Sequence, residues 1–546
     1  MLLHQFLFDH LHAHGVRHIF GIPGDFVLNL YNALEDDGRF QLVTLSHEPA
    51  VGFAADGAAR ISNGLGVCLV TYGAGGLNMI NSVACAYAEE SPLVVISGGP
   101  SRLEKQSGML VHHEVKSFES QFKIYQEVVE AGAIIDNPDT AAAGIHHAID
   151  VALKFKRPVY LEIPRDMVFT DIPVPSSFAE VDLPIDERAI DAAAREIVNR
   201  LSRARQPVLI VGVEVHRFQL TGAVVALAER LKIPVISSFL GRGIFPTHHP
   251  QFIGTYLGAV SPPAMRQVVE QSDCLLMLGE RLSDVSLGVS ADLLRDRELI
   301  TVVARDVFIK PNRYEHTSLE RVVERLLAAP GLPEAADPIS AIGADISPEV
   351  FDPFKQDESI KMRHVINLLN EFFGDHPDMP LVADTGDALF ATVDIRANQC
   401  IAPAYYGTMG FSIPAALGVQ IASGKRPLVL LGDGAFQMTG TEIAHARQYR
   451  CNPIIVLLNN SRWEMLQAFF PHAHYNETVS WPFAKLAELW GGRGIQAFTP
   501  RQLRAALEAA HGESRFTLIE VGLQKGDVSP ILRGFVEAFK KRVYVS

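Results

Sequence analysis

Residues 427–463 read PLVLLGDGAFQMTGTEIAHARQYRCNPIIVLLNNSRW, and this stretch decides the fold. Its two short apolar runs, 427–432 and 453–458, have the length and the uninterrupted apolar character of buried strands. Between them, residues 435–450 have the pattern of a helix. A strand, a helix and a second strand in this order predict one right-handed crossover between parallel strands.

Polar residues follow both predicted strands directly. Gly432-Asp433-Gly434 comes after the first strand, and Asn459-Asn460 comes after the second. Because ligands bind at the carboxyl edge of a parallel sheet, we expect Asp433 and Asn460 to meet there. Two oxygen donors beside glycine-freed backbone amides suit Mg²⁺ that carries a diphosphate. Taken alone, Gly-Asp-Gly would favour a tight turn in an ordinary βαβ unit, and the Asn pair at the end of the next strand is what favours the cofactor interpretation.

The 546 residues are too many for one hydrophobic core and predict three domains of ordinary size. Short apolar strands alternate with helical segments along most of the chain, which is the rhythm of doubly wound α/β domains with parallel sheets. We expect domains at 1–170, 190–330 and 356–546. A proline-rich linker at 171–187 and a second linker at 330–354 separate them.

Composition limits the possible partners and compartments. The formal net charge of −14, without any Lys/Arg-rich run, argues against a nucleic-acid partner. The 5 cysteines lack metal-type spacing and indicate buried thiols in a reducing compartment. The amphipathic start differs from a signal peptide, and no apolar run approaches the ~20 residues of a membrane span. The expected location is the cytoplasm.

The first and third predicted domains share a sequence pattern. Gly52-Phe53 matches Gly410-Phe411, and further matches continue in order up to a glycine-rich turn that follows a strand in each copy. At that turn the first copy has Ala74 where the second has Asp433. This predicts a duplicated domain in which one copy kept the metal carboxylate; chance similarity of two βα units is the alternative.

The Gly-Asp-Gly to Asn-Asn module resembles the cofactor signature of thiamine diphosphate enzymes. The resemblance implies the thiamine diphosphate-binding fold, with a pyrimidine-binding first domain and a diphosphate-binding third domain. It implies that Mg²⁺ is bound by Asp433, Asn460 and Arg462. It also implies cofactor contacts at Gly432, Gly434 and Ala435. The turn 405–411 resembles the pyrimidine-binding turn of the family, in which Met409 would support the bent cofactor and the Gly407 carbonyl would accept a hydrogen bond.

Glu48 lies between a predicted strand and a helix of small residues. A glutamate at the start of a helix is usually only a partner of the helix dipole. Here the segment 44–60 resembles the activating-glutamate segment of the family. The resemblance implies that Glu48 shares a proton with the aminopyrimidine and so promotes formation of the ylid.

Asp25, Thr71 and the pair His112-His113 occur where 2-keto acid decarboxylases carry an Asp, a Thr and two histidines. A single His pair in a chain with 20 histidines would otherwise indicate a solvated loop. The resemblance implies that these residues hold the substrate carboxylate and later deliver a proton.

The sequence departs from pyruvate decarboxylases at two positions. Leu466 stands where that family has a glutamate, and Glu464, two residues earlier, is expected to face elsewhere on a helix. Leu389 stands where pyruvate-specific enzymes carry a larger aromatic residue. The smaller Leu389 would make room for a larger substrate side chain, and Leu466 would add apolar lining. Both changes point to an aromatic or long aliphatic 2-keto acid, and the resemblance as a whole is strongest to phenylpyruvate and indolepyruvate decarboxylases.

The resemblance implies non-oxidative decarboxylation of an aromatic or bulky 2-keto acid through an ylid and an enamine, giving an aldehyde and CO2. It implies a homodimer at minimum, and commonly a homotetramer, in which Glu48 of one chain faces Asp433 and Asn460 of the other. One alternative is a carboligase of the acetolactate synthase type on the same fold. Another is a non-catalytic nucleotide-binding α/β protein.

Overall fold

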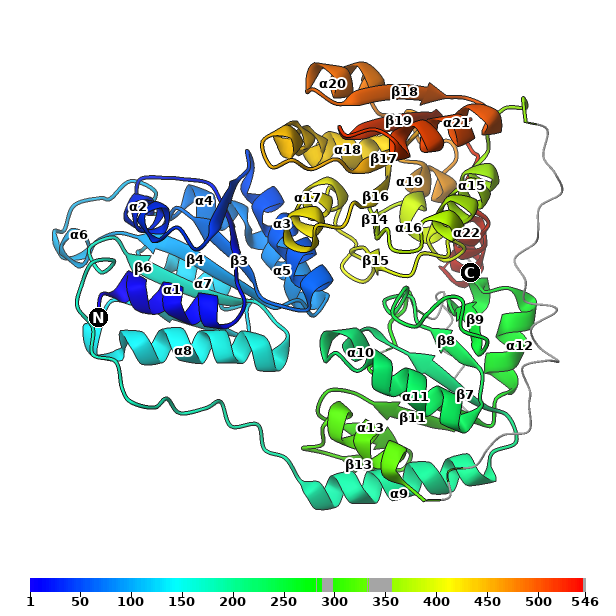
Figure 1. Cartoon of the computed structure of the whole chain (residues 1–546), viewed down its shortest axis with the longest axis horizontal. Coiled ribbons are helices and arrows are strands. Elements are labelled where there is room, and N and C mark those ends of the chain that lie inside the picture. Colours follow the sequence, from blue (N-terminus) through cyan, green and yellow to red (C-terminus); the bar gives the residue numbers. More distant parts are fainter. Residues whose placement is uncertain (281, 287–297, 331, 333–355, 544–546) are drawn as a thin grey trace.

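The computed structural model describes residues 1–280, 282–286, 298–330, 332 and 356–543. They form three α/β units, each with a central sheet that is covered by helices (Figure 1). Each sheet lies within one of the three predicted ranges, and the α/β fold class with parallel-dominated sheets is confirmed. Most of the predicted second linker, 330–354, lies outside the described residues.

The first sheet is entirely parallel and has the strand order β2-β1-β3-β4-β6-β5. Its strands are β1 (His18–Gly21), β2 (Gln41–Thr44), β3 (Gly66–Val70), β4 (Leu93–Gly99), β5 (Ala131–Ile134) and β6 (Val159–Pro164). Its helices are α1 (Leu3–Ala13), α2 (Leu28–Asp37), α3 (Glu48–Ser62), α4 (Ala74–Asn78), α5 (Ile80–Ala88), α6 (Arg102–Gln106), α7 (Ser120–Tyr125) and α8 (Pro138–Phe155).

Alternating side chains of β3 show how this sheet separates two cores. Val67 and Leu69 pack with α1 and α8 on one face. Cys68 and Val70 pack on the other face, in a cluster that also contains residues of the third sheet. Successive side chains of a strand point to opposite faces of the sheet. The face that carries Cys68 and Val70 therefore shares one core with the third unit.

The third sheet is also entirely parallel, and its order β15-β14-β16-β17-β19-β18 repeats the permutation of the first sheet. Its strands are β14 (Leu381–Ala383), β15 (Cys400–Ile401), β16 (Leu428–Gly432), β17 (Ile454–Asn459), β18 (Arg493–Ala497) and β19 (Thr517–Gly522). Its helices are α15 (Met362–Asp375), α16 (Asp387–Ala391), α17 (Ser412–Ser423), α18 (Asp433–Thr439), the 3₁₀ segment η3 (Gly440–Arg447), α19 (Glu464–Phe469), α20 (Phe483–Leu489), α21 (Pro500–His511) and α22 (Pro530–Val543). The common strand order supports the predicted duplication.

The prediction of one helix over 435–450 was wrong. The chain forms α18 and then η3, with the break at Thr439 and Gly440. Thr439 leaves the helical region, and its hydroxyl donates a hydrogen bond to the Gly410 carbonyl. A tertiary hydrogen bond next to a glycine, which is a poor helix former, accounts for the interruption.

The middle sheet is mixed and has the order β13-β12-β11-β10-β7-β8-β9, in which β12 and β13 are antiparallel to their neighbours. Its strands are β7 (Pro207–Val211), β8 (Val235–Ser237), β9 (Phe252–Thr255), β10 (Cys274–Leu278), β11 (Leu299–Val302), β12 (Val307–Ile309) and β13 (Asn312–Tyr314). Its helices are α9 (Glu187–Arg203), α10 (Val213–Arg217), α11 (Thr221–Leu231), the 3₁₀ turn η1 (Gly258–Val260), α12 (Pro263–Gln271) and α13 (Leu319–Ala328). Residues 173–186, in the predicted first linker, have no helix or strand and lead to α9 (Figure 1).

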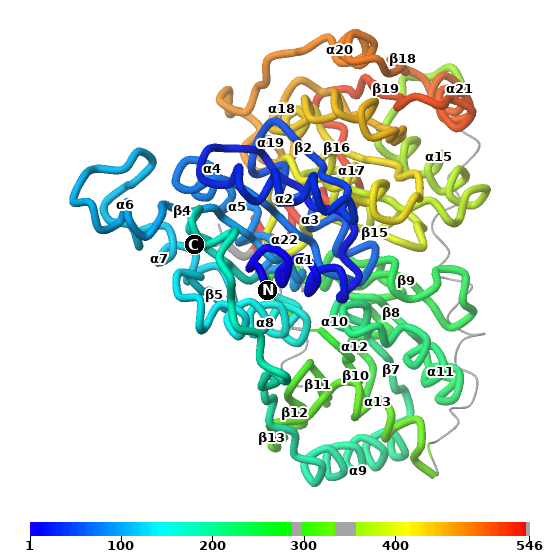
Figure 2. Tube along the Cα trace, turned by 60° about the vertical axis from the view of Figure 1, so that its left-hand side comes forward, coloured from blue at the N-terminus to red at the C-terminus, as the bar shows by residue number. Residues whose placement is uncertain are grey.

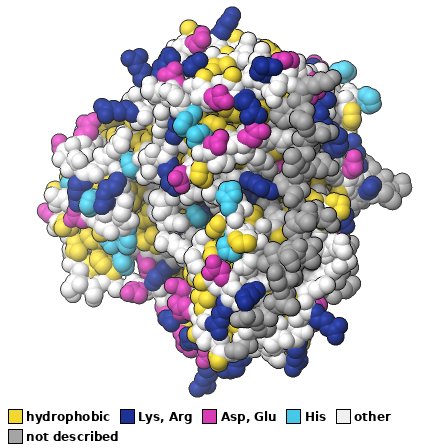
Figure 3. All heavy atoms as spheres, turned by 45° about the vertical axis from the view of Figure 1, so that its right-hand side comes forward, with side chains coloured by type: hydrophobic (Ala, Val, Ile, Leu, Met, Phe, Trp, Pro, Cys, Tyr) yellow, Lys and Arg dark blue, Asp and Glu magenta, His cyan; other side chains and the backbone are white. Residues whose placement is uncertain are grey.

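Two features concern the molecular surface. Within the described ranges, no helix combines the length and apolar character needed to cross a membrane. Acidic and basic side chains are interspersed over the described part of the face shown in Figure 3.

The first and third units meet through α3 and α17. A Cβ atom added to Gly418 would lie 1.9 Å from the Ala54 carbonyl oxygen, and one added to Gly57 would lie 2.4 Å from that of Ala415. The two helices therefore touch backbone to backbone. Because the residue number rises along one helix as it falls along the other, α3 and α17 run antiparallel.

We expect Gly418→Ala to lower the free energy of unfolding by about 1–3 kcal/mol, because the new methyl group would force the two helix backbones apart. Urea denaturation would measure the loss. Gly374→Ala is the matched control, since a Cβ atom there meets nothing within 4 Å. The control should be neutral or stabilising by up to about 1 kcal/mol. Equal midpoints for the two variants would contradict the proposed helix contact.

Candidate functional site

A cavity of about 290 Å³ lies at the carboxyl edge of the third sheet. Strands β16 and β17, which pair in parallel, end at Gly432 and Asn459 beside this cavity. The structure thus brings the predicted strand-end residues together. The cavity lining includes the predicted residues Gly407, Met409, Gly432, Asp433, Gly434, Ala435, Asn460, Arg462 and Leu466.

Asp433 is a buried carboxylate of this cavity and is 2% exposed. One carboxylate oxygen accepts a hydrogen bond from the Gly434 N–H at 2.9 Å, and the other accepts from the Thr478 hydroxyl at 3.1 Å. Burial raises its pKa to about 6. A bound cation would offset the desolvation that this anion suffers, so the donor chemistry fits Mg²⁺.

Three glycines expose their backbone to the same cavity. A Cβ atom added to Gly386, Gly407 or Gly432 would have no neighbour within 4 Å. Gly386 and Gly407 also have φ values of 116° and 71°, which L-residues rarely adopt. An open glycine-lined wall next to a buried carboxylate fits a diphosphate bound through a divalent cation.

Two carboxylates of this region were missed at the sequence level. Asp384 is fully buried and accepts hydrogen bonds from the N–H groups of Gly410 and Ser412, so it holds the start of α17. Asp387 lines the cavity and accepts from the N–H and hydroxyl of Ser529. Both follow strand β14, as Asp433 follows β16, and the same strand-end reasoning could have found them.

The expectation that Glu464 faces elsewhere was wrong. Glu464 is the first residue of α19 and lines the same cavity as Leu466, since helical periodicity positions a side chain poorly at a helix end. One of its oxygens accepts from the Gly526 N–H at 3.0 Å, and burial raises its pKa. The side chain is 5% exposed, whereas that of Leu466 is 46% exposed.

Leu389 does not line the cavity. Its side chain is 5% exposed and packs in an apolar cluster with Phe239, Phe390 and Phe535, while the neighbouring Ala388 lines the wall. Leu389 is therefore not part of the lining of this cavity, and its influence on pocket size stays a prediction.

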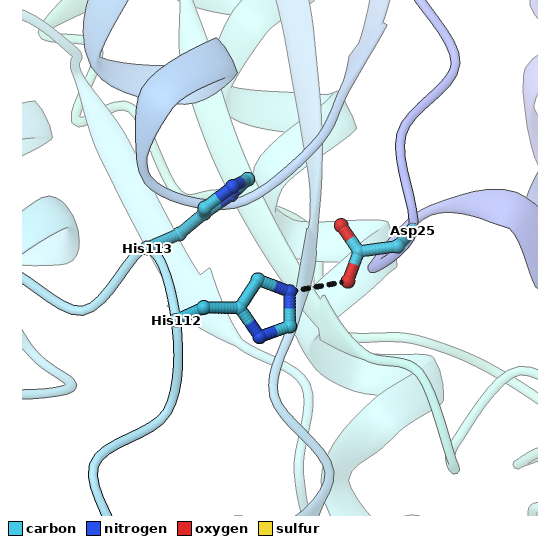
Figure 4. A group of neighbouring side chains, drawn as sticks. All are labelled: Asp25, His112 and His113. Carbon is cyan, nitrogen blue, oxygen red and sulfur yellow. Dashed lines mark hydrogen bonds and ion pairs between the residues drawn. The ribbon is translucent and has the colours of Figure 1, made fainter.

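A second group of predicted residues lies at the carboxyl edge of the first sheet. Asp25 and His112 form a 2.7 Å hydrogen bond between a carboxylate oxygen and Nε2 (Figure 4). His113 donates from Nδ1 to the Tyr72 carbonyl at 3.0 Å, which leaves its Nε2 free to act on a ligand. The Asp25 and His112 side chains are exposed, and the segment around α6 that precedes the histidines projects from the body of the molecule (Figure 2).

Thr71 and Glu48 also belong to this group, because both lie close to the glycine turn that follows β3. A Cβ atom on Gly24 would clash with Thr71, and one on Gly75 would contact both the Thr71 methyl group and the Glu48 carboxylate. The buried Thr71 hydroxyl oxygen has no hydrogen-bond partner. Glu48 accepts from the Asn78 amide at 2.7 Å. The five predicted catalytic residues thus share one neighbourhood.

Within one chain, this neighbourhood and the cavity are separate. All residues that line the cavity come from 385–523. Glu48 begins α3, and because α3 and α17 are antiparallel it lies opposite the end of α17, whereas Gly407 and Met409 precede the start of that helix. At 1.5 Å per residue, the 12 residues of α17 separate the two by about 18 Å. The backbone N–H of Ser46, two residues before Glu48, donates a hydrogen bond to the Glu442 carboxylate. Glu442 belongs to η3 and does not line the cavity, so this contact agrees with a position of Glu48 away from the cavity.

Comparison with protein families gives three matches in chain order. Residues 1–124 match "Thiamine pyrophosphate enzyme, N-terminal TPP binding domain". Residues 194–329 match the central domain of the same enzymes, and residues 384–521 match their C-terminal TPP binding domain. Thiamine pyrophosphate is another name for thiamine diphosphate.

Comparison with individual proteins finds similarity along nearly the whole chain. An indole-3-pyruvate decarboxylase of Azospirillum brasilense is 40% identical over 99% of this chain and 99% of its own length. Pyruvate decarboxylase 1 of Pisum sativum is 28% identical over 94% of this chain and 89% of its own length. Pyruvate decarboxylase 1 of Arabidopsis thaliana is 28% identical over 94% and 87%.

We expect Asp433→Ala to weaken Mg²⁺-dependent cofactor uptake by more than ~100-fold. Loss of a residue that only contacts a metal ligand can already weaken metal binding up to about 100-fold, and Asp433 is assigned as a ligand itself. Fluorescence or calorimetric titration of the apo-protein with thiamine diphosphate and Mg²⁺ would measure it. Asp375→Ala is the control, since Asp375 is exposed at the end of α15. Normal uptake by Asp433→Ala would contradict the metal assignment.

Proposed function

The chain belongs to the family of thiamine pyrophosphate enzymes and is a thiamine diphosphate-dependent 2-keto acid decarboxylase, and we propose that it acts on an aromatic substrate of the phenylpyruvate or indolepyruvate type. The observation that carries this choice is the full-length similarity to an indole-3-pyruvate decarboxylase. The cavity supports it, because Leu458, Met465, Leu466 and Leu523 give it an apolar wall that suits a large side chain.

We further propose that the side chains of Asp433 and Asn460 and the backbone carbonyl of Arg462 would hold Mg²⁺, which would anchor the cofactor diphosphate against the glycine-lined wall. Gly407 and Met409 would contact the pyrimidine end. When bound, the cofactor supplies the nucleophilic carbon and the electron sink that decarboxylation of a 2-keto acid requires. The protein supplies a fixed position and a site from which much of the water is excluded.

The residues of the first unit have separate tasks in this proposal. Glu48 would form a charge-assisted hydrogen bond with the aminopyrimidine ring of the cofactor and would hold a proton there. The Asp25–His112 pair and the free Nε2 of His113 bind the substrate carboxylate and donate the proton that replaces CO2. The unpaired Thr71 hydroxyl is available for a hydrogen bond to the same substrate.

We propose that the complete site forms between two copies of the chain. The observation that supports this is the separation of Glu48 from the cavity within one chain, with both parts accessible from outside. A two-fold pair would place Glu48 of each copy at the cavity of the other, so a homodimer is the minimum and a homotetramer is compatible. The cytoplasm suits all five cysteines, which are free thiols.

The reconstituted enzyme should convert phenylpyruvate and indolepyruvate to the corresponding aldehydes and CO2. We expect kcat/KM for these acids to exceed that for pyruvate by at least ~10-fold, since the large apolar pocket loses contacts with a methyl side chain. A panel of 2-keto acids assayed by aldehyde-linked NADH oxidation measures this. Pyruvate as the preferred substrate would contradict the substrate class, and acetolactate as the product from pyruvate would indicate a carboligase instead.

Glu48→Gln should retain thiamine diphosphate but lower kcat by about 10²–10⁴-fold, because the amide cannot exchange a proton with the aminopyrimidine. Cofactor content and turnover are measured on the same preparation. Glu35→Gln, at an exposed position of α2, is the control and should keep full turnover. Undiminished turnover in Glu48→Gln would exclude the assigned role.

The two variants together test the shared site. Co-expression of Glu48→Gln with Asp433→Ala should restore about one quarter of wild-type turnover, because about half of randomly formed dimers contain one intact site out of two. Each variant expressed alone is the control. Recovery no greater than in the separate variants would show that both residues act within one chain.

A further inference from the structure

Three donor groups at the carboxyl edge of the first sheet lie close enough together to bind one metal ion. One carboxylate oxygen of Asp25 and one ring nitrogen each of His112 and His113 all lie within 4.8 Å of one another. In the part of the chain that the structure describes, no other three His, Cys, Asp or Glu side chains meet this condition. Figure 4 shows the His112 ring directed at the Asp25 carboxylate, with the His113 side chain next to it. Ligand atoms on one tetrahedral zinc ion are about 3.3 Å apart, so a small contraction brings all three donors onto one ion.

His113 already has the arrangement of a metal-binding histidine. Its Nδ1 lies 3.0 Å from the Tyr72 carbonyl oxygen, and because a carbonyl can only accept, Nδ1 carries the proton and Nε2 the lone pair. Histidines that bind metals almost always make such a second hydrogen bond, which fixes the tautomer and the ring.

The backbone of His113 is held in an unusual conformation. Its φ is 69°, in the left-handed region that residues other than glycine rarely adopt. His113 packs directly on the glycine turn after β3, since a Cβ atom added to Gly73 would lie 2.4 Å from the His113 carbonyl oxygen. This contact fixes the distance between the His113 ring and the turn. Residues held in such conformations by their surroundings are concentrated at functional sites.

The other two donors share one support. The His112 ring stacks on the buried Phe26, with ring centroids 4.8 Å apart. Phe26 directly follows Asp25, and its backbone packs on β4 so closely that a Cβ atom added to Gly98 would lie 2.1 Å from the Phe26 carbonyl oxygen. Asp25 and His112 are therefore fixed relative to each other although they lie 87 positions apart in the chain. Contacts within the protein order the cluster before any ligand binds.

The donor set differs from that of the cavity in the third unit. The donors expected at Asp433 and Asn460 are oxygens, which Mg²⁺ prefers. Two imidazole nitrogens with one carboxylate suit zinc and other divalent transition metals, and three protein ligands leave coordination positions open. All three side chains are exposed, so an ion from solution can reach them.

We propose that Asp25, His112 and His113 bind a divalent transition metal ion, with Zn²⁺ as the best fit, and that the bound ion blocks turnover. The ion takes the lone pairs of both histidines and an oxygen of Asp25. These are the groups to which binding of the substrate carboxylate and delivery of the proton were assigned above. The block rests on that proposed function, whereas binding of the ion rests on the geometry alone.

Calorimetric titration of the holoenzyme with Zn²⁺ tests the site, with Mg²⁺ and thiamine diphosphate in excess so that the cofactor site stays filled. Co²⁺ titrated in parallel reports nitrogen ligands through its visible absorption. We expect His113→Gln and Asp25→Asn each to weaken zinc binding at least ~10-fold, because loss of a residue that only contacts a metal ligand already costs about 10–100-fold. His147→Gln, at an exposed position of α8, is the matched control and should leave the affinity unchanged.

The same preparations test the block. Zinc should inhibit the wild type and His147→Gln in competition with phenylpyruvate, and phenanthroline, a nitrogen chelator that leaves Mg²⁺ in place, should restore turnover. Zinc bound through these residues with undiminished turnover would support the metal site and overturn the block.

Equal zinc affinity in the wild type, His113→Gln and His147→Gln would overturn the metal site. If His113→Gln fails to fold, Asp25→Asn, which changes only an exposed carboxylate, gives the same comparison. Because the titration measures no turnover, its result does not depend on whether the decarboxylase assay succeeds.

Discussion

The backbone contact between α3 and α17 is the constraint on which the arrangement of the two cofactor domains depends. Gly57 and Gly418 allow the helices to approach until each glycine touches a carbonyl of the other helix. At this distance any side chain would act as a wedge, so the contact fixes both the separation and the antiparallel direction of the helices. Their direction in turn sets which end of α3 is near which end of α17.

From this direction follows the division of the functional residues. Glu48 begins α3 and Ser412 begins α17, so antiparallel packing puts these two helix starts at opposite ends of the shared contact. The two domains have the same strand order, as expected if they are copies of one ancestral domain. Each copy therefore presents its own carboxyl edge on a different side, and each kept a different set of polar residues there. Within a single chain, the cavity of the third unit and the residue group around Glu48 in the first unit therefore stay apart.

From the sequence, the residues that meet at the ends of neighbouring strands could be predicted better than the contacts that depend on distant parts of the chain. Asp433 and Asn460 could be placed together because parallel strands share their carboxyl edge, which is a local rule. The same rule applies to Asp387, which follows β14 and lines the same cavity. The break at Thr439 could not be predicted, since it depends on a hydrogen bond to Gly410, 29 positions away. The predicted position of Glu464 was wrong because helical periodicity positions a side chain poorly at the end of a helix. Whether Leu389 lines a cavity could not be predicted, because it depends on packing against Phe239 of another domain.

The buried ionic groups at the three-domain junction need a reason other than stability. Asp56 and Arg60 lie one helical turn apart on α3, almost fully buried, and replacing such a pair with apolar residues is often stabilising. Apolar residues, however, could not form hydrogen bonds with backbone groups of another domain. Arg60 donates to the Ala402 carbonyl, and Glu89 accepts two N–H groups at 405 and 406. The charges thus fix the register between α3, α5 and the segment that leads to Gly407.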